Sequence, residues 1–245
     1  MKYTPPVSTE EKRFLARVAD LLRRTEKSGQ AVFSDFLDLR EQELAKQAAG
    51  STPTVFFGGF TGAERVMLGV NATEDADFPI IPLDFTVYGS FDHRDVLGSV
   101  LGLGLDRAKV GDILLCDGGF RVFLADTVAS FVASELSRVG RAPVKQAESG
   151  SLPVSLPRRE EHTDTLASVR LDSLVAAMAN LSRADATALI TRGMVMVNHL
   201  PVEKPSFSPE EGDVLSLRGY GKFEIDDLGG VSRKGRVIVR YRKYL

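Results

Sequence analysis

The middle of the chain carries the feature that most restricts its fold, an alternation of strand-like and helix-like segments between residues 79 and 147. Apolar runs predict the strands, and stretches that begin at Asp92 and Asp126 with helical spacing predict the helices. In chain order these are strand 80–88, helix 92–103, strand 113–116, strand 121–124, helix 126–139 and strand 143–146. This order is that of the split β-α-β, or ferredoxin-like, fold. RNA-recognition motifs share this order, but so do proteins with many unrelated activities, so the order says little about function.

The segments before this alternation predict a mainly helical N-terminal domain. Apolar residues recur at helical spacing over residues 8–28, and Gly29 ends that helix. Ser34 is the expected N-cap of a second helix, which ends near Gly50. Two short strands are then expected at 53–57 and 66–70.

The segments after the alternation predict a helix pair on a small, strongly turned sheet. Ser182 is the expected N-cap of the second helix, and Gly193 follows its last turn. The predicted elements are helices 166–181 and 183–192, then strands 194–197, 214–218 and 222–225. The chain is therefore predicted to be an α+β protein of three small domains. We expect them at residues 1–76, 77–150 and 165–245, with a linker at 151–164 and a basic C-terminal extension within the last domain.

The charge of the chain is divided unevenly along its length. Residues 1–164 carry 19 Lys and Arg against 24 Asp and Glu, a net charge of −5. Residues 165–245 carry 12 against 9, a net charge of +3, and residues 228–245 have six basic side chains and no acidic one. This polarity indicates that only the C-terminal part meets a polyanion. The alternative is a solvated basic tail.

Composition excludes several classes of protein. The single cysteine, Cys116, leaves no internal disulfide and no cysteine-based structural zinc site. No apolar run approaches the roughly 18–20 residues that cross a bilayer, and the first residues lack the apolar core of a secretory signal. Three histidines far apart in sequence give no support to a metal or triad site. We expect a cytoplasmic protein with no cofactor, no metal and no membrane contact.

Residues 165–220 resemble the ribosomal protein S-four RNA-binding domain. The residues that carry the match are, in order, Arg170-Leu171-Asp172, Leu181-Ser182-Arg183, Leu189-Ile190, Gly193-Met194-Val195-Met196-Val197-Asn198, Lys204-Pro205-Ser206 and Gly212-Asp213. Double-helical RNA hides its bases in a deep groove, so proteins read its shape, phosphates and 2′-hydroxyls. A rigid helix pair that carries arginine and lysine suits that task.

The predicted RNA-binding side chains are basic or aromatic residues at the ends of these elements. They are Arg170, Arg183, Arg192, Lys204, Arg218, Tyr220, Lys222, Arg233, Lys234 and Arg236. Arg183 lies in the first turn of the second helix, where free backbone N–H groups also favour a phosphate. Glycines on both sides of Tyr220 allow the backbone close to a ligand.

Some of these residues have a structural alternative. Asp172 is interpreted as an ion-pair partner on the helix rather than an RNA contact. Arg192 could serve only the C-terminus of its helix, and Tyr220 could stack on a base or cover the sheet. His199 is interpreted as a surface residue at the tip of a turn.

Over nearly all of its 245 residues the chain resembles the YlmH family of bacterial RNA-binding proteins. The added matches are Leu39-Arg40-Glu41-Gln42, Phe57-Gly58-Gly59, Ala63-Glu64-Arg65, His93-Arg94-Asp95-Val96-Leu97-Gly98, Gly102-Leu103-Gly104-Leu105-Asp106-Arg107, Gly111-Asp112-Ile113, Val139-Gly140-Arg141 and Arg218-Gly219-Tyr220-Gly221-Lys222-Phe223. The resemblance implies a helical, an RNA-recognition-like and an S-four-type domain, and a non-catalytic, ribosome-associated role in rescue of stalled large subunits that hold peptidyl-tRNA. The chain departs from the family at His199-Leu200-Pro201, where members are more basic.

The middle domain offers a second candidate site. Arg94 and Arg107 could form a second basic RNA-binding site, or pair with Asp95 and Asp106, which we favour. Residues 119–123 weakly resemble the stacking strand of RNA-recognition motifs, but Phe123 is interpreted as a core residue.

Three functions compete at this point. The first is a non-enzymatic, monomeric factor that binds rRNA or tRNA on the large ribosomal subunit, and does not bind DNA. The second is an RNA-modifying enzyme, of the pseudouridine synthase or methyltransferase type, that uses the same domain for targeting. The third is an interaction protein in cell division. We favour the first, because no catalytic constellation is evident in the sequence.

Overall fold

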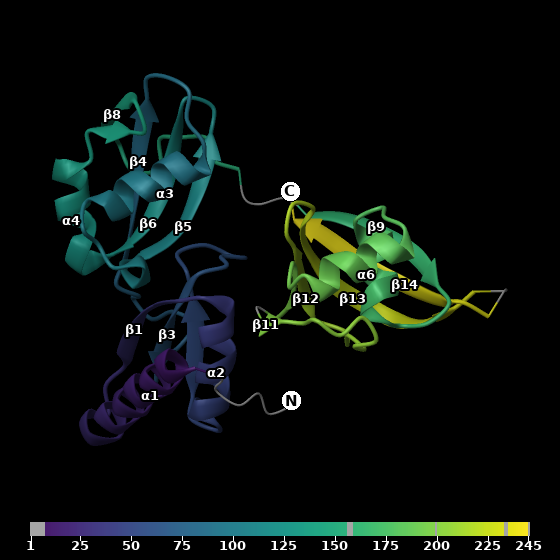
Figure 1. The fold of residues 1–245 in the computed structure, drawn as a ribbon. Helices are drawn as coiled ribbons and strands as arrows, with labels where there is room; N and C mark the ends of the chain where they lie inside the picture. The colour runs from purple at the N-terminus through teal and green to yellow at the C-terminus, as the bar shows by residue number, and fades with distance from the viewer. Residues whose placement is uncertain (1–7, 156–158, 199, 233–234, 245) are drawn as a thin grey trace. The chain divides into compact units, whose positions relative to one another are not determined.

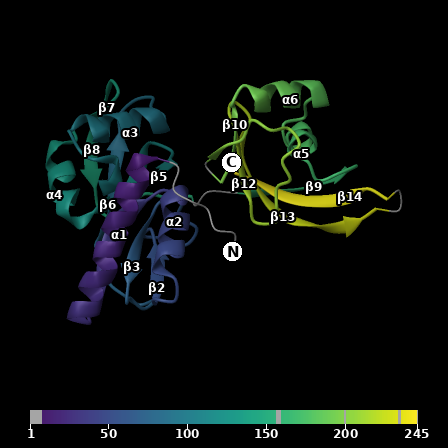
Figure 2. The same cartoon turned by 60° about the horizontal axis from the view of Figure 1, so that its bottom comes forward.

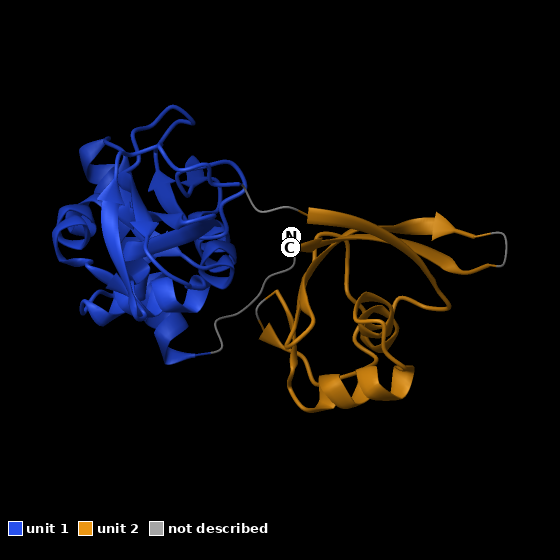
Figure 3. Cartoon of the chain, turned by 90° about the horizontal axis from the view of Figure 1, so that it is seen from above, with its two compact units in different colours: residues 1–156 blue, residues 157–245 orange. Residues whose placement is uncertain are grey.

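The computed structural model describes residues 8–155, 159–198, 200–232 and 235–244. The chain divides into two compact units, the N-terminal unit (residues 1–156) and the C-terminal unit (residues 157–245) (Figure 3).

The first half of the N-terminal unit packs two helices on a small antiparallel sheet (Figure 1). The elements are α1 (Thr9–Ser28), β1 (Val32–Leu37), α2 (Leu39–Ala49), β2 (Thr54–Phe57) and β3 (Val66–Val70), and the strand order is β1-β3-β2. Phe14 and Val18 of α1 meet Leu44 of α2 and Leu68 of β3 in one apolar cluster. The sheet buries its helix-facing side in this way.

The expected helix from Ser34 is wrong at its start. Residues 32–37 form β1, and α2 begins after Asp38, which makes a capping box with Glu41. The Ser34 hydroxyl accepts a hydrogen bond from the Leu68 N–H at 2.9 Å, so it serves the β1–β3 pairing. Val32, Phe33 and Phe36 favour a strand because β-branched and aromatic side chains pack well on a pleated surface. This half thus combines two helices with a sheet.

The second half of the N-terminal unit has the predicted ferredoxin-like order. Its elements are β4 (Ile80–Val87), α3 (His93–Gly102), the short 3-10 helix η1 (Arg107–Lys109), β5 (Val110–Cys116), β6 (Gly119–Ala125), α4 (Asp126–Glu135), β7 (Arg138–Val139) and β8 (Ala142–Ala147). The antiparallel sheet runs β5-β6-β4-β8-β7. Val96 of α3 and Val132 of α4 pack with Phe85 and Phe120, so both helices cover one face (Figure 1).

The opposite face of this sheet is covered by other parts of the same unit. Phe123 is buried with Phe36 and Met67 from the first half, which confirms its expected place in the core. On the central strands, Arg121 Nε donates to Asp84 Oδ1 at 2.6 Å, and the Leu152 N–H donates to Asp84 Oδ2 at 3.2 Å. The face on which RNA-recognition motifs stack bases is therefore closed by the chain itself.

The C-terminal unit packs the predicted helix pair on one side of a six-stranded antiparallel sheet (Figure 2). Its elements are β9 (Arg159–Leu166), α5 (Leu171–Met178), α6 (Arg183–Thr191), β10 (Val195–Val197), β11 (Leu200–Pro201), β12 (Val214–Leu217), β13 (Gly221–Val231) and β14 (Val237–Tyr244). The strand order is β11-β10-β12-β13-β14-β9. Leu171, Leu174 and Ile190 of the helices join Leu215 and Phe223 of the sheet in one core.

Two expectations about the ends of this unit differ from the structure. Residues 159–166, expected to lie largely in a linker, form β9. The C-terminal extension is β14, which pairs with β9 from Arg159↔Tyr244 to Leu166↔Val237. Val239 and Tyr241 point into the core, so β14 completes the sheet.

Candidate nucleic-acid interface

Arg170, Asp172 and Arg183 form one cluster at the start of the two helices. Arg170 is the extended residue before α5, and Ser182 caps α6 by accepting from the Asp185 N–H at 3.1 Å, which places Arg183 in the first turn. Arg170 donates to both oxygens of Asp172, from Nε at 3.1 Å and from Nη2 at 2.9 Å. Arg183 Nη2 reaches the same carboxylate at 3.3 and 3.4 Å. One carboxylate therefore holds two guanidinium groups together.

The electrostatics of this cluster favour an anion. The hydrogen bonds from Arg170, followed by those from Arg183, lower the pKa of the Asp172 carboxyl from 3.8 to about 2. The Asp172 side chain is 8% exposed, whereas Arg183 is 59% exposed. Asp172 is thus an ion-pair partner, as expected, and it compensates only one of the two positive charges. The free donors of both arginines remain open to a ligand, because a guanidinium has five N–H groups.

Lys204 lies on a loop that is bound to the start of α5. The Asp172 N–H donates to the Pro205 carbonyl at 3.0 Å, and the Leu171 N–H donates to the Phe207 carbonyl at 2.8 Å. These bonds satisfy backbone donors that a helix start leaves without intrahelical partners. They bring the loop that carries exposed Lys204 to the same end of the helix pair as Arg170.

Arg192, Arg218 and Tyr220 gather where β10 begins and β12 ends. Arg192 is the exposed residue after α6, and Met194 follows it by two residues. The Arg218 N–H donates to the Met194 carbonyl at 3.0 Å, which brings Arg218 close to Arg192 in the fold. Tyr220 is 37% exposed between Gly219 and Gly221, both of which have positive φ. Among the described residues, neither arginine side chain has a hydrogen-bond or ion-pair partner. These cations are free for a phosphate.

Most of the described basic side chains nearer the C-terminus already contact another residue of the chain. Lys222 Nζ lies 4.7 Å from the centre of the Tyr244 ring, and Arg236 Nη2 donates to the Thr165 carbonyl at 2.6 Å. Arg242 pairs with Asp226 at 2.6 Å. Arg233, Lys234 and His199 lie outside the described residues.

Sequence reasoning missed the acidic partners of the last strand. Glu224 and Asp226 of β13 lie across from the basic residues of β14, so the stretch that looked purely basic is neutralised in part by its neighbour. The alternation of apolar Val237, Val239 and Tyr241 was the available signal, because a period of two predicts a strand.

Arg94 and Arg107 are not brought together. Arg94 lies in the first turn of α3, and Arg107 lies after the helix ends at Gly102, so about 12 Å of helix separates Arg94 from the end that leads to Arg107. The favoured pairing with Asp95 and Asp106 is wrong for the described residues, because those carboxylates accept from backbone N–H groups at the starts of α3 and η1. Arg107 instead turns inward and donates to the Val110 carbonyl.

Comparison with known proteins agrees with this architecture. Residues 74–151 match the family model described as "Putative RNA-binding domain in YlmH", and residues 169–215 match that of the S4 domain. The solved structure titled cell division protein YlmH from Streptococcus pneumoniae is 21% identical, with a TM-score of 0.52, over 60% of this chain and 94% of its own, and supports the fold. In the described part of the chain, no helix is both long and apolar enough to cross a membrane.

One full-length relative extends this match to both units. It is the Bacillus subtilis (strain 168) protein named ribosome-associated protein quality control protein P2, which is 31% identical over 245 residues. The alignment covers 96% of this chain and 95% of the relative. With both family models and this relative in agreement, the chain belongs to the YlmH family.

Proposed function

We propose that this protein is a non-catalytic, cytoplasmic RNA-binding factor that associates with the large ribosomal subunit. The observation that carries the proposal is the cluster in which Asp172 holds Arg170 and Arg183 side by side at the starts of two helices. Guanidinium groups bind phosphate through bidentate hydrogen bonds, and here their positions are fixed before the RNA binds.

The proposed ligand is folded RNA, meaning rRNA or tRNA, rather than DNA. A rigid helix pair can follow the backbone of an A-form helix, whose wide minor groove displays 2′-hydroxyls. Exposed Arg192, Arg218 and Lys204 add further phosphate contacts. Tyr220 supplies an aromatic face for an unpaired base.

The ribosomal role rests on the relative from Bacillus subtilis, whose name describes ribosome-associated protein quality control. We extend that role to this chain, as a monomer acting on stalled large subunits that still hold tRNA. The alternatives of RNA modification and of a cell-division scaffold have no catalytic cluster or partner surface in their favour among the described residues.

Ribosome co-sedimentation tests the proposal. The change is Arg183→Glu, and the matched control is Arg240→Glu in the same unit, whose side chain is 66% exposed against 59% for Arg183. We expect Arg183→Glu to abolish co-sedimentation and Arg240→Glu to retain it. Equal retention by both variants would exclude the Arg183 surface as the ribosome contact.

Binding of purified RNA should also weaken steeply with salt. If about five phosphates are neutralised, the slope of log affinity against log salt is expected at about −3.5 to −4.5. Fluorescence anisotropy with an RNA hairpin at several salt concentrations measures it, and a slope near zero would contradict a phosphate-based contact.

A further inference from the structure

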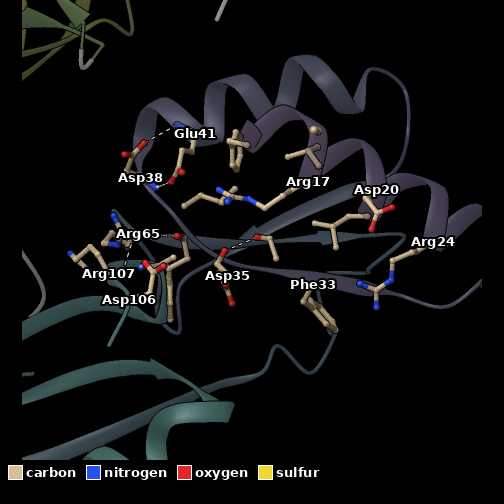
Figure 4. Close-up of a pocket in the computed structure, with 18 residues that line it drawn as sticks. Arg17, Asp20, Arg24, Phe33, Asp35, Asp38, Glu41, Arg65, Asp106 and Arg107 are labelled. Atoms are coloured by element: carbon tan, nitrogen blue, oxygen red, sulfur yellow. Dashed lines mark hydrogen bonds between the residues drawn. The ribbon is translucent and has the colours of Figure 1, made fainter. Parts of the chain in front are cut away.

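The N-terminal unit has a pocket that the C-terminal surface does not explain. Its volume is about 810 Å³, and it lies between one face of α1, the length of β1, the start of α2 and η1. Figure 4 shows Arg65 and Arg107 next to one another at one end, with Arg24 and Asp20 at the other end. A pocket of this size can hold a small ligand or a segment of a chain.

Both arginines at this end are fixed by the same carbonyl group. Arg65 Nε donates to the Val110 carbonyl at 3.0 Å, and Arg107 Nη1 donates to that oxygen as well. Arg65 Nη2 also donates to the Phe36 carbonyl at 3.1 Å. Within the described ranges, Arg65 Nη1 and Arg107 Nη2 have no hydrogen-bond partner. Two rigid guanidinium groups therefore keep open donors beside the pocket.

The charges of four nearby carboxylates offset part of the burial cost of Arg65, but among the described residues none of them forms an ion pair with either arginine; they are Asp38, Glu41, Asp106 and Asp112. Asp112 accepts from the N–H groups of Glu64 and Arg65 at 2.6 and 3.1 Å, and Asp38 and Asp106 accept from backbone N–H groups at the starts of α2 and η1. No carboxylate of a described residue lies within 4.0 Å of either guanidinium. These carboxylates accept from backbone N–H groups, and the two guanidinium groups lie next to one another.

Burial of the two arginines outweighs the attraction of these carboxylates. It lowers the pKa of Arg107 to about 10, with a further contribution from the charge of Arg65, and it also lowers the pKa of Arg65. Both groups stay protonated at neutral pH. Adjacent like charges that are half removed from water are stabilised by an anion between them.

We propose that the Arg65–Arg107 end of this pocket binds a phosphate group. Paired planar guanidinium groups match the tetrahedral oxygens of phosphate, and Arg17 lines the same pocket from α1. The phosphate could belong to an RNA strand or to a free nucleotide, since both present the same oxygens. The proposed site uses no residue of the C-terminal unit.

Inorganic phosphate is the probe for a first experiment. The full chain is titrated with phosphate at constant ionic strength, with chloride as the balancing anion, and the arginine Nε–H signals are followed by nuclear magnetic resonance. We expect saturable shifts at Arg65 and Arg107 in the native protein and in the control variant Arg94→Gln, an exposed arginine of the same unit. In Arg107→Gln the affinity should fall at least tenfold.

The native titration decides the matter even if Arg107→Gln fails to fold. Shifts that do not saturate, or that leave both arginines unmoved, would overturn the proposal, as would equal affinity in a folded Arg107→Gln. Parallel titrations with uridine monophosphate and with an RNA hairpin identify the source of the phosphate. Arg183→Glu should keep this response while losing ribosome binding, so the two proposals fail separately.

Discussion

The carboxylate of Asp172 contacts both arginines that we propose to bind RNA, so substitution there separates the effect of charge from that of geometry. Asp172→Asn raises the net charge of the site by one, which alone would strengthen RNA binding. It also weakens the hydrogen bonds that position Arg170 and Arg183. We expect the loss of positioning to outweigh the gain in positive charge, so that the affinity for an RNA hairpin falls about tenfold, or about 1.4 kcal/mol.

Asp185→Asn is the matched control, since it adds the same charge in the first turn of α6, where the Asp185 side chain contacts neither arginine. Asp185 accepts only from Ser182 within its turn. The affinity of the Asp185→Asn variant for the RNA hairpin should rise or stay level. If Asp172→Asn binds RNA as tightly as Asp185→Asn does, the cluster acts through its charge alone.

The pKa of Asp172 also sets a pH window for stability. Because the folded-state pKa is about 2 against an ordinary 3.8, the cluster stabilises the fold above about pH 4, and this contribution is lost as pH falls towards 2. The difference in unfolding free energy between native protein and Asp172→Asn should be constant from pH 5 to 8 and shrink below pH 4. Urea titrations across this range measure it, and a difference that shrinks between pH 6 and 8 would point to another group.

Among the elements, the pairing of β14 with β9 and β13 depends on Tyr241. Its ring is 4% exposed, lies 5.3 Å from that of His162 and 6.0 Å from that of Phe223, and its hydroxyl donates to Asp164 at 2.8 Å. Tyr241→Ala should lower the unfolding free energy of the C-terminal unit by about 3–5 kcal/mol, as for other buried aromatic residues.

Tyr220→Ala is the comparison for that measurement. The Tyr220 side chain is 37% exposed in a turn, so its removal should change the free energy of unfolding by less than about 0.5 kcal/mol. Denaturant unfolding followed by circular dichroism measures both variants. Equal losses for the two would mean that Tyr241 does not anchor the last strand.

The elements also show what a sequence can and cannot predict here. The ferredoxin-like order and the helix pair followed from local periodicity and caps such as Asp92 and Ser182, because those signals lie within each element. β9 was missed because it is a polar strand, REEHTDTL, whose partner lies more than 70 residues away. The convergence of Arg65 and Arg107 could not be predicted either, since only folding brings the residue before β3 next to η1.

At the scale of the whole molecule, the two units have separate cores, so they should unfold separately. In the N-terminal unit, Asp84 is fully buried and paired with Arg121, and removing one partner of such a pair costs about 3–5 kcal/mol. Asp84→Ala should therefore shift only the N-terminal transition, and Tyr241→Ala only the C-terminal one. Calorimetry resolves the two transitions, and a joint shift would show that the units unfold together.

The antiparallel ladder between β9 and β14 has a consequence for synthesis of the protein. β9 is the first strand of its unit to be translated and β14 is the last. β9 therefore has no partner strand until residues 237–244 have left the ribosomal exit tunnel. A nascent chain that stalls before that point leaves the edge of β13 unpaired, and unpaired edges invite aggregation. The unit thus completes its sheet only after translation has passed its final strand.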